Sequence, residues 1–376
     1  MNNATIKQIR VATIQAELPD PVIFGDWIMK TREFAVVAVE LNNGVEGFAF
    51  TLTRDGAVAE QIRKSIRGTY IGTDINDLSS TYVTAKRRSL ASHSSGIGLR
   101  ALSIVDLACW DALAKNKDLS ITALLNGPRN PMPATAIIGY PPGKMGGKEV
   151  KEQVANLYTQ GWRRFKCPVA ATKELSKERL KAAREVAPDA WIGCDAAWIY
   201  RDVESALEFL DHIKDVNLGW FEDIFAPGDA ALVSELRRKA NVPIAMGDEQ
   251  GGSYYPESLI IHKAVDVIRI DLTCMGGITG GREIVDQCLN AEIDFAPHMF
   301  AHVHSQVFSA WGYAKPIEWG VPWTGVDPYA DSLAQPKIIE GGLMLPLPEE
   351  PGFGNLINID WILTQQHHDP EGIFNL

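Results

Sequence analysis

From about Pro133 onward, short β-branched runs alternate with amphipathic helical stretches. In RDVESALEFLDHIK, apolar side chains recur on one helical face, at Val203, Ala206, Leu210 and Ile213. Alternating β and α units predict parallel strands. Eight such runs within about 210 residues favour a closed (β/α)8 barrel over an open sheet. The candidate strands are ATAIIGY, RRFKCP, AWIGCD, LGWFED, VPIAMGD, DVIRID, EIDFAPH and AKPIEW.

The segments before and after this alternating region have different sequence patterns. Near the N-terminus, EFAVVAVEL and VEGFAFTL flank Asn42-Asn43-Gly44, which predicts a β-hairpin, and a buried helix is expected from Ala101 to Leu113. The last residues are rich in proline and glycine and too few for a domain. We therefore predict an α/β fold: an α+β capping domain over residues 1–130, a (β/α)8-type barrel over 131–345, and a C-terminal segment, 346–376, that packs back on the cap.

Composition excludes several classes of partner. The net charge is −11 and basic residues are not clustered, which disfavours nucleic acid and anionic membranes. The chain has no apolar run long enough to cross a bilayer, and its N-terminus lacks the layout of a signal peptide. The 5 cysteines are scattered without CxxC spacing, so we expect buried reduced thiols. These features indicate a cytoplasmic protein, in which an anionic substrate would need locally placed cations.

Ionisable residues end nearly every candidate strand, at intervals of 20 to 29 residues. One polar residue after a strand means little, because loops are polar anyway. Seven in register point to an active site, since barrel enzymes carry theirs at the carboxyl ends of the strands. The residues are Lys166, Asp195, Glu222, Asp248, Asp271, His298 and Glu318.

Three consecutive strands end in Asp195, Glu222 and Asp248. Their carboxylates would converge and repel one another without a counter-ion. A hard divalent cation with oxygen ligands removes this repulsion, and Mg²⁺ suits a few carboxylates together with water and substrate oxygens. Asp223 and Glu249 are adjacent candidates, but neighbours on a strand point oppositely, so one of each pair should face the centre.

Asp271 and His298 end the next two strands. A carboxylate bonded to one imidazole nitrogen fixes the tautomer and makes the other nitrogen a competent general base near neutral pH. The stretch DFAPHMFAHVH also contains His302 and His304. His-x-His can chelate zinc, but such a site needs a third protein ligand. We expect a capping or packing role for these two histidines.

Several motifs resemble the enolase superfamily, and within it the mandelate racemase-like group. They span almost the whole chain: VDLACWDALAKNKDLSITALLNG, GWRRFK, WFED, IAMGDE, IDLTCMGGITGG, APHMF, IEW and the late PGFG. The resemblance implies Mg²⁺ on Asp195, Glu222 and Asp248, and a homo-oligomer. It also implies that His298, paired with Asp271, removes the proton α to a substrate carboxylate or expels a β-hydroxyl. Glu318 would hydrogen-bond that carboxylate in a protonated state with a raised pKa, favoured by nearby carboxylates.

One departure concerns the end of the second barrel strand, where the family usually shows Lys-x-Lys and this chain has Lys166-Cys167-Pro168. In one alignment Lys166 is the first lysine and neutralises the substrate carboxylate, which leaves His298 as the one strong base. In the other, Arg164 takes the first place and Lys166 is a second base. Two opposed bases permit racemisation, whereas one base that next serves as acid permits dehydration.

The departure favours dehydration of a sugar acid to a 2-keto-3-deoxy acid, that is, a hydro-lyase. A cycloisomerase or lactonising enzyme, or a racemase or epimerase, is the alternative. A binding protein that has lost its chemistry would lack a ligand or dyad member, and none is missing. Leu18–Lys30 and Thr51–Gly56 resemble the family's two capping loops. We expect substrate contacts from Trp27 and Arg54, and from His93.

Overall fold

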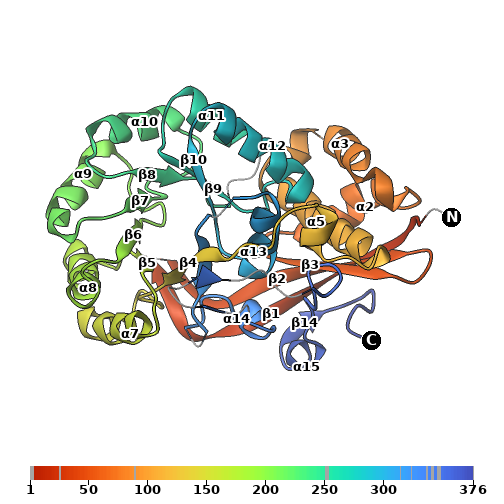
Figure 1. Cartoon of the computed structure of the whole chain (residues 1–376), viewed down its shortest axis with the longest axis horizontal. Helices are drawn as coiled ribbons and strands as arrows, with labels where there is room; N and C mark the ends of the chain where they lie inside the picture. Colours follow the sequence, from red (N-terminus) through yellow and green to blue (C-terminus); the bar gives the residue numbers. More distant parts are fainter. Residues whose placement is uncertain are drawn as a thin grey trace.

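The computed structural model describes residues 4–24, 27–88, 90–249, 254–313, 315–322, 324–335, 338–339, 343–344 and 349–375. An antiparallel sheet with its helices lies beside a ring of parallel strands and helices (Figure 1). This confirms the predicted fold, a (β/α)8-type barrel with an N-terminal cap. Within the described part, no helix combines the length and apolar character needed to cross a membrane.

The cap is built on a four-stranded sheet in the order β14-β1-β2-β3. The predicted hairpin joins β2 and β3, with Glu40 opposite Glu46 and Gly44 at φ 85°. Helix α5 lies so close to β3 that a Cβ on Gly47 would come within 2.2 Å of the Ala112 nitrogen. The strands are β1 (Ile6–Phe24), β2 (Trp27–Leu41), β3 (Glu46–Leu52) and β14 (Gln366–His368), and the helices are α1 (Val58–Gln61), α2 (Arg67–Tyr70), α3 (Leu78–Arg88), α4 (Leu90–His93), α5 (Gly96–Asn116) and α6 (Ile121–Leu124).

The barrel strands run parallel in the order β10-β9-β8-β7-β6-β5-β4, and β11 pairs with β4, so the ring is nearly closed. Its strands are β4 (Met132–Ile137), β5 (Arg164–Pro168), β6 (Trp191–Asp195), β7 (Trp220–Glu222), β8 (Ile244–Met246), β9 (Val267–Ile270), β10 (Asp294–Pro297) and β11 (Ile317–Gly320). The outer helices are α7 (Gly147–Thr159), α8 (Lys173–Val186), α9 (Val203–His212), α10 (Ala230–Lys239), α11 (Tyr254–Ile261), α12 (Gly277–Asn290) and α13 (Ala301–Ala310).

The C-terminal segment returns to the cap, as predicted. After α14 (Pro328–Asp331), β12 (Ile338–Ile339), β13 (Leu343–Met344) and α15 (Ile359–Ile362), strand β14 pairs with β1, placing His368 opposite Thr13. The buried Asp111 carboxylate of α5 accepts hydrogen bonds from the Phe353 N–H (2.8 Å) and the Phe48 N–H (2.7 Å). It therefore ties this segment to β3 through the central helix.

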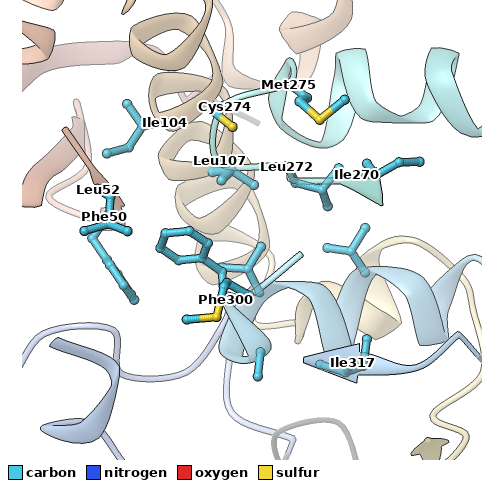
Figure 2. Packing of buried hydrophobic residues seen from close by; sticks show 14 of the residues in the cluster. Phe50, Leu52, Ile104, Leu107, Ile270, Leu272, Cys274, Met275, Phe300 and Ile317 are labelled. Carbon is cyan, nitrogen blue, oxygen red and sulfur yellow. The ribbon is translucent and has the colours of Figure 1, made fainter. Parts of the chain in front are cut away.

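Apolar side chains of the cap and the barrel pack in one cluster, which includes Ile270 at the end of β9 (Figure 2). Phe50 of β3 lies with its ring centroid 5.8 Å from that of Phe300 and 4.1 Å from that of Tyr329. Leu272 and Cys274, in the loop after β9, pack in the same cluster. The five cysteines are all free and buried, as expected. This packing fixes the cap over the mouth of the barrel.

Candidate active site

Three carboxylates converge at the mouth of the barrel. Asp195 ends β6, Glu222 ends β7 and Asp248 follows β8, and one oxygen of each lies within 4.8 Å of the others. Glu222 is fully buried, and its Oε2 has no hydrogen-bond partner. Burial raises the pKa of Glu222, and the neighbouring carboxylates add to the rise while Lys166 and Arg269 oppose it. A buried carboxylate oxygen without a hydrogen-bond partner, within three converging carboxylates, fits Mg²⁺, which prefers such ligands.

The adjacent acidic residues lie outside this cluster. Asp223 and Glu249 have left-handed backbones, with φ of 46° and 54°, and both line the cavity beside the cluster. The Gly247 N–H donates to Asp223 Oδ1 over 3.3 Å. Glu249 pairs with Arg54 and, over 2.7 Å, with Arg100. Burial raises the pKa of Glu249, but these two cations outweigh it and hold the pKa well below its usual range.

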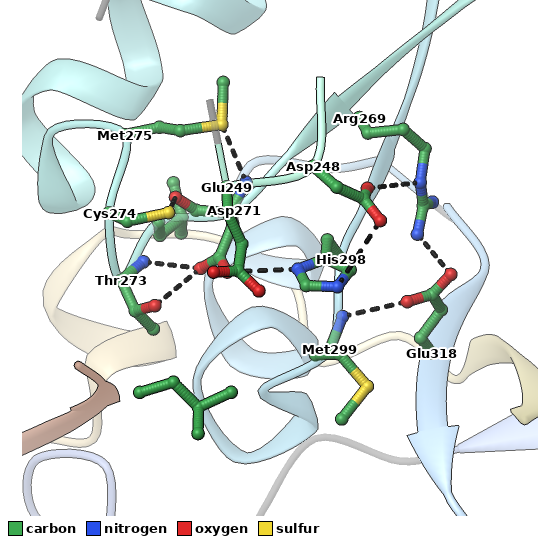
Figure 3. A network of polar contacts seen from close by, with 12 residues as sticks. Asp248, Glu249, Arg269, Asp271, Thr273, Cys274, Met275, His298, Met299 and Glu318 are labelled. Atoms are coloured by element: carbon green, nitrogen blue, oxygen red, sulfur yellow. Dashed lines mark hydrogen bonds and ion pairs between the residues drawn. The ribbon is translucent and has the colours of Figure 1, made fainter. Parts of the chain in front are cut away.

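Asp271 and His298 form the predicted pair (Figure 3). His298 Nδ1 lies 3.1 Å from Asp271 Oδ2, and its Nε2 points toward the carboxylate cluster, 3.4 Å from Asp248 Oδ2. The Thr273 N–H (2.8 Å) and hydroxyl (2.7 Å) donate to Asp271 Oδ1 and fix its orientation. Burial lowers the pKa of His298, but the charge of Asp248 and the bond to Asp271 outweigh it and raise the pKa to about 9. A cation among the carboxylates would reduce the Asp248 contribution.

Glu318 contradicts one prediction. Its Oε1 accepts from Lys166 Nζ over 2.7 Å and pairs with the Arg269 guanidinium, and its Oε2 accepts from the Met299 N–H over 3.1 Å. Burial raises its pKa, but the two cations outweigh burial and hold the pKa at about 2. This shift is opposite in direction to the raised pKa that the sequence predicted. An anionic Glu318 accepts hydrogen bonds and has no proton to donate to a substrate carboxylate.

Sequence reasoning missed Arg269, the cation responsible for much of this effect. It lies on β9 two residues before Asp271 and is fully buried. Its Nε lies 3.0 Å from Asp248 Oδ1, and its guanidinium is 4.9 Å from the centroid of the Trp220 ring. The available signal was an arginine within the apolar run VIRI, on the same face as Asp271 because strand side chains alternate.

Lys166 lies among three carboxylates. Its Nζ is 2.7 Å from Glu222 Oε1 and 3.4 Å from Asp195 Oδ2, in addition to its contact with Glu318. Burial lowers its pKa, but the surrounding carboxylates outweigh burial and raise it well above the usual value. In the metal-free protein these carboxylates favour the cationic form of Lys166.

The two alignments of the Lys166 region place different residues in the cavity. Pro168, two residues beyond Lys166, lines the same cavity and pairs at the level of Asp195. Arg164 instead lies over the Trp191 ring, 4.0 Å from its centroid, and is absent from that lining. This geometry favours the alignment in which Lys166 is the first lysine and Pro168 occupies the second position.

Two adjoining cavities lie between cap and barrel. One, of about 80 Å³, reaches Lys166, Asp248 and His298, and the other, of about 250 Å³, extends under the cap. Five residues line both: Arg32, Leu52, Arg54, Trp198 and Glu249. Arg32, which sequence reasoning did not single out, is only 5% exposed, and its Nε has no hydrogen-bond partner.

The three predicted cap contacts differ in outcome. Arg54 lines both cavities, where it pairs with Glu249. The side chain of Trp27 lies outside the described residues. His93 is fully buried, its Nδ1 lies 2.9 Å from the Ala85 carbonyl oxygen, and it lines neither cavity. The prediction for His93 is therefore wrong, because this side chain is turned into the helices of the cap.

His302 and His304 are buried in α13 and bond to backbone groups. Burial lowers the pKa of both, that of His302 to about 4. Over the described ranges, the cluster able to hold a metal consists of carboxylates and includes neither histidine. The zinc alternative finds no support among these residues, and both rings are packed inside the protein.

Comparison with known families bears out the resemblance of the sequence to the enolase superfamily. Residues 8–126 match the mandelate racemase / muconate lactonizing enzyme N-terminal domain, and residues 149–361 match the enolase C-terminal domain-like family. The chain belongs to the enolase superfamily. An L-rhamnonate dehydratase of Saccharopolyspora erythraea is 28% identical to this chain, in an alignment that covers 96% of this chain and 92% of the dehydratase.

Solved structures share this enolase-superfamily fold. The L-talarate/galactarate dehydratase of Salmonella typhimurium superposes with a TM-score of 0.85 at 21% identity, covering 98% of this chain and 94% of that one. A racemase of Streptomyces coelicolor with bound magnesium superposes with a TM-score of 0.85 at 19% identity, and the match covers 96% of this chain and 99% of the racemase. The fold is common to enzymes with different reactions, so the reaction has to be argued from the site.

Proposed function

We propose that this protein is a Mg²⁺-dependent hydro-lyase that dehydrates a sugar acid to a 2-keto-3-deoxy acid. The observation that carries the proposal is the Asp271–His298 pair at the reaction cavity. His298 faces the carboxylate cluster with Asp271 behind it, whereas Lys166 contacts Glu318 and Glu222, and the cavity lining has Pro168 two residues beyond it, which supports the alignment with a single strong base. A single base that becomes an acid suits dehydration better than racemisation.

In the first step, His298 Nε2 removes the proton from C2, next to the substrate carboxylate, and the C–H electrons form an enediolate. Asp271 keeps the proton of Nδ1 in place and stabilises the resulting imidazolium. Lys166 contributes positive charge near the developing enediolate. Mg²⁺ at Asp195, Glu222 and Asp248 would supply further positive charge for the same purpose.

In the second step, the imidazolium gives its proton to the C3 hydroxyl as the C3–O bond breaks, and the enediolate electrons form the C2–C3 double bond. Water leaves, and the enol tautomerises to the 2-keto acid. His298 is then neutral again and ready for another cycle. The distal part of the substrate would extend into the larger cavity, where Arg32, Thr31 and Glu33 offer polar groups to hydroxyls or to a second carboxylate.

The test is a screen of mono- and diacid sugars with Mg²⁺, assayed for 2-keto acid formation. A substrate should be found, and His298→Asn should abolish its turnover while Mg²⁺ still binds. No turnover across the library, with turnover of a lactone instead, would replace the proposal by the cycloisomerase alternative. Racemisation would appear as α-deuterium incorporation into both C2 epimers in D₂O without loss of water.

A further inference from the structure

One histidine outside the proposed reacting groups connects the two segments that carry them. His304 is fully buried in α13. The Leu272 N–H donates to its Nε2 over 3.0 Å, and its Nδ1 lies 2.6 Å from the Met299 carbonyl oxygen. A backbone N–H only donates and a carbonyl only accepts, so Nδ1 carries the proton and Nε2 the lone pair. The ring is therefore neutral and held in one tautomer.

The two bonded backbone groups come directly after the members of the dyad. Leu272 follows Asp271, and Met299 follows His298. His304 Nε2 also lies 3.8 Å from Asp271 Oδ1. One imidazole thus bridges the end of β9 and the end of β10, just where these strands present the carboxylate and the base.

The turn on the His298 side is strained. Met299 and Phe300 have φ of 47° and 45°, in the left-handed region that residues with a Cβ rarely adopt. Such a conformation persists only where its surroundings enforce it. Here the Met299 N–H donates to Glu318 and the Met299 carbonyl accepts from His304. Without the second bond, we expect the turn to relax and the His298 ring to move with it.

We propose that His304 is a positioning residue, which sets the distance and orientation between Asp271 and His298 by bridging the backbone after each. It touches no reacting atom. This inference rests on the proposed function in one respect, because a displacement of His298 is measured as a loss of turnover. The rings of Phe300 and Phe308 pack edge-on against the imidazole, with centroids 6.4 Å and 5.9 Å away, and hold it in place.

A matched pair of variants tests this role. His302 lies on the same helix and is 1% exposed, but its ring bonds to the Ala334 carbonyl, away from the dyad. In His304→Phe, kcat should fall by about 10²-fold, as expected for a displacement of about 1 Å, while KM and Mg²⁺ affinity change by less than about threefold. In His302→Phe, stability should fall, but kcat should stay within about threefold of wild type.

His304→Asn is the conservative variant. Its side-chain N–H can take the place of Nδ1–H and keep the Met299 bond, but it is too short to reach Leu272. Its kcat should therefore lie between those of wild type and His304→Phe. Wild-type kcat in folded His304→Phe, or in His304→Asn if the Phe variant does not fold, overturns the proposal. An equal loss of kcat in His302→Phe overturns it as well.

Hydrogen–deuterium exchange separates this inference from the proposed function. The backbone amides of residues 299–304 should exchange faster in His304→Phe than in His304→Asn, His302→Phe or wild type, whereas the Leu272 amide should exchange faster in both His304 variants. If wild type turns over no acid in the screen, the proposed function fails, but the exchange measurement still decides. Unchanged exchange at residues 299–304 in His304→Phe would show that the bridge does not hold the turn.

Discussion

Replacing Glu318 by Gln tests whether this carboxyl group is protonated, as the sequence predicted, or ionised, as its contacts with Lys166 and Arg269 favour. Gln has nearly the shape of a protonated Glu, so the substitution should be almost neutral if Glu318 is protonated in the folded protein. If it is an anion, the change removes a buried counter-ion at 2.7 Å from Lys166 Nζ and another contact to Arg269. Two unit charges at that distance attract by about 6 kcal/mol at an effective dielectric constant of about 20.

The expected loss of stability is smaller than this attraction, because Lys166 keeps Glu222 and Arg269 keeps Asp248 as partners. Breaking a buried pair by removing one partner costs about 3–5 kcal/mol. For 376 residues, the unfolding entropy near 60 °C is about 0.8 kcal/mol per degree, so the melting temperature should fall by about 4–6 °C.

The assay is thermal unfolding of the metal-free protein near pH 7, with Glu349→Gln as the control. Glu349 also pairs with an arginine, Arg129, but its side chain is 86% exposed, so its loss should shift the midpoint by less than about 1 °C. A depressed carboxyl pKa contributes stability above its unfolded value of 4.5, and this stability is lost as the pH falls toward 2. An unchanged melting temperature in Glu318→Gln would refute an anionic Glu318.

Four further outcomes are expected. Chelation with EDTA should abolish turnover. In thermal unfolding, Mg²⁺ at about 100 times its Kd should stabilise the folded protein by about 2.7 kcal/mol, because Mg²⁺ neutralises the carboxylate cluster around Glu222. Asp271→Asn should lower kcat by at least about 10²-fold with Mg²⁺ affinity, measured by calorimetry, unchanged. Burial lowers the pKa of His302 from 6.5 to about 4, so the free energy of unfolding should fall by up to about 3 kcal/mol as the pH is lowered through this window. Urea titrations measure this loss, and His302→Gln should flatten the dependence of the unfolding free energy on pH. Arg32→Met should raise KM by about tenfold and leave kcat nearly unchanged, and an unaffected KM would place the substrate elsewhere.

The sequence alone predicted the fold and the residues that converge at the barrel mouth, because both follow from the regular spacing of strands and helices along the chain. Alternating β and α units predict a parallel barrel, and a residue at the end of each strand arrives at the same mouth whatever the details of packing. Asp195, Glu222 and Asp248 converge for this reason, and so do Asp271 and His298. The hairpin before β3 follows from equally local turn chemistry.

Only the tertiary structure decided charge states and orientations, because these depend on distances across the barrel that no strand encodes by itself. Arg269 on β9 meets Glu318 on β11 and lowers its pKa, which is opposite to the direction predicted from the neighbouring carboxylates. His93 turns into the helices of the cap, away from the substrate cavities. His304, whose packing role was foreseen, bridges the ends of β9 and β10, a contact fixed only once the two strands lie side by side.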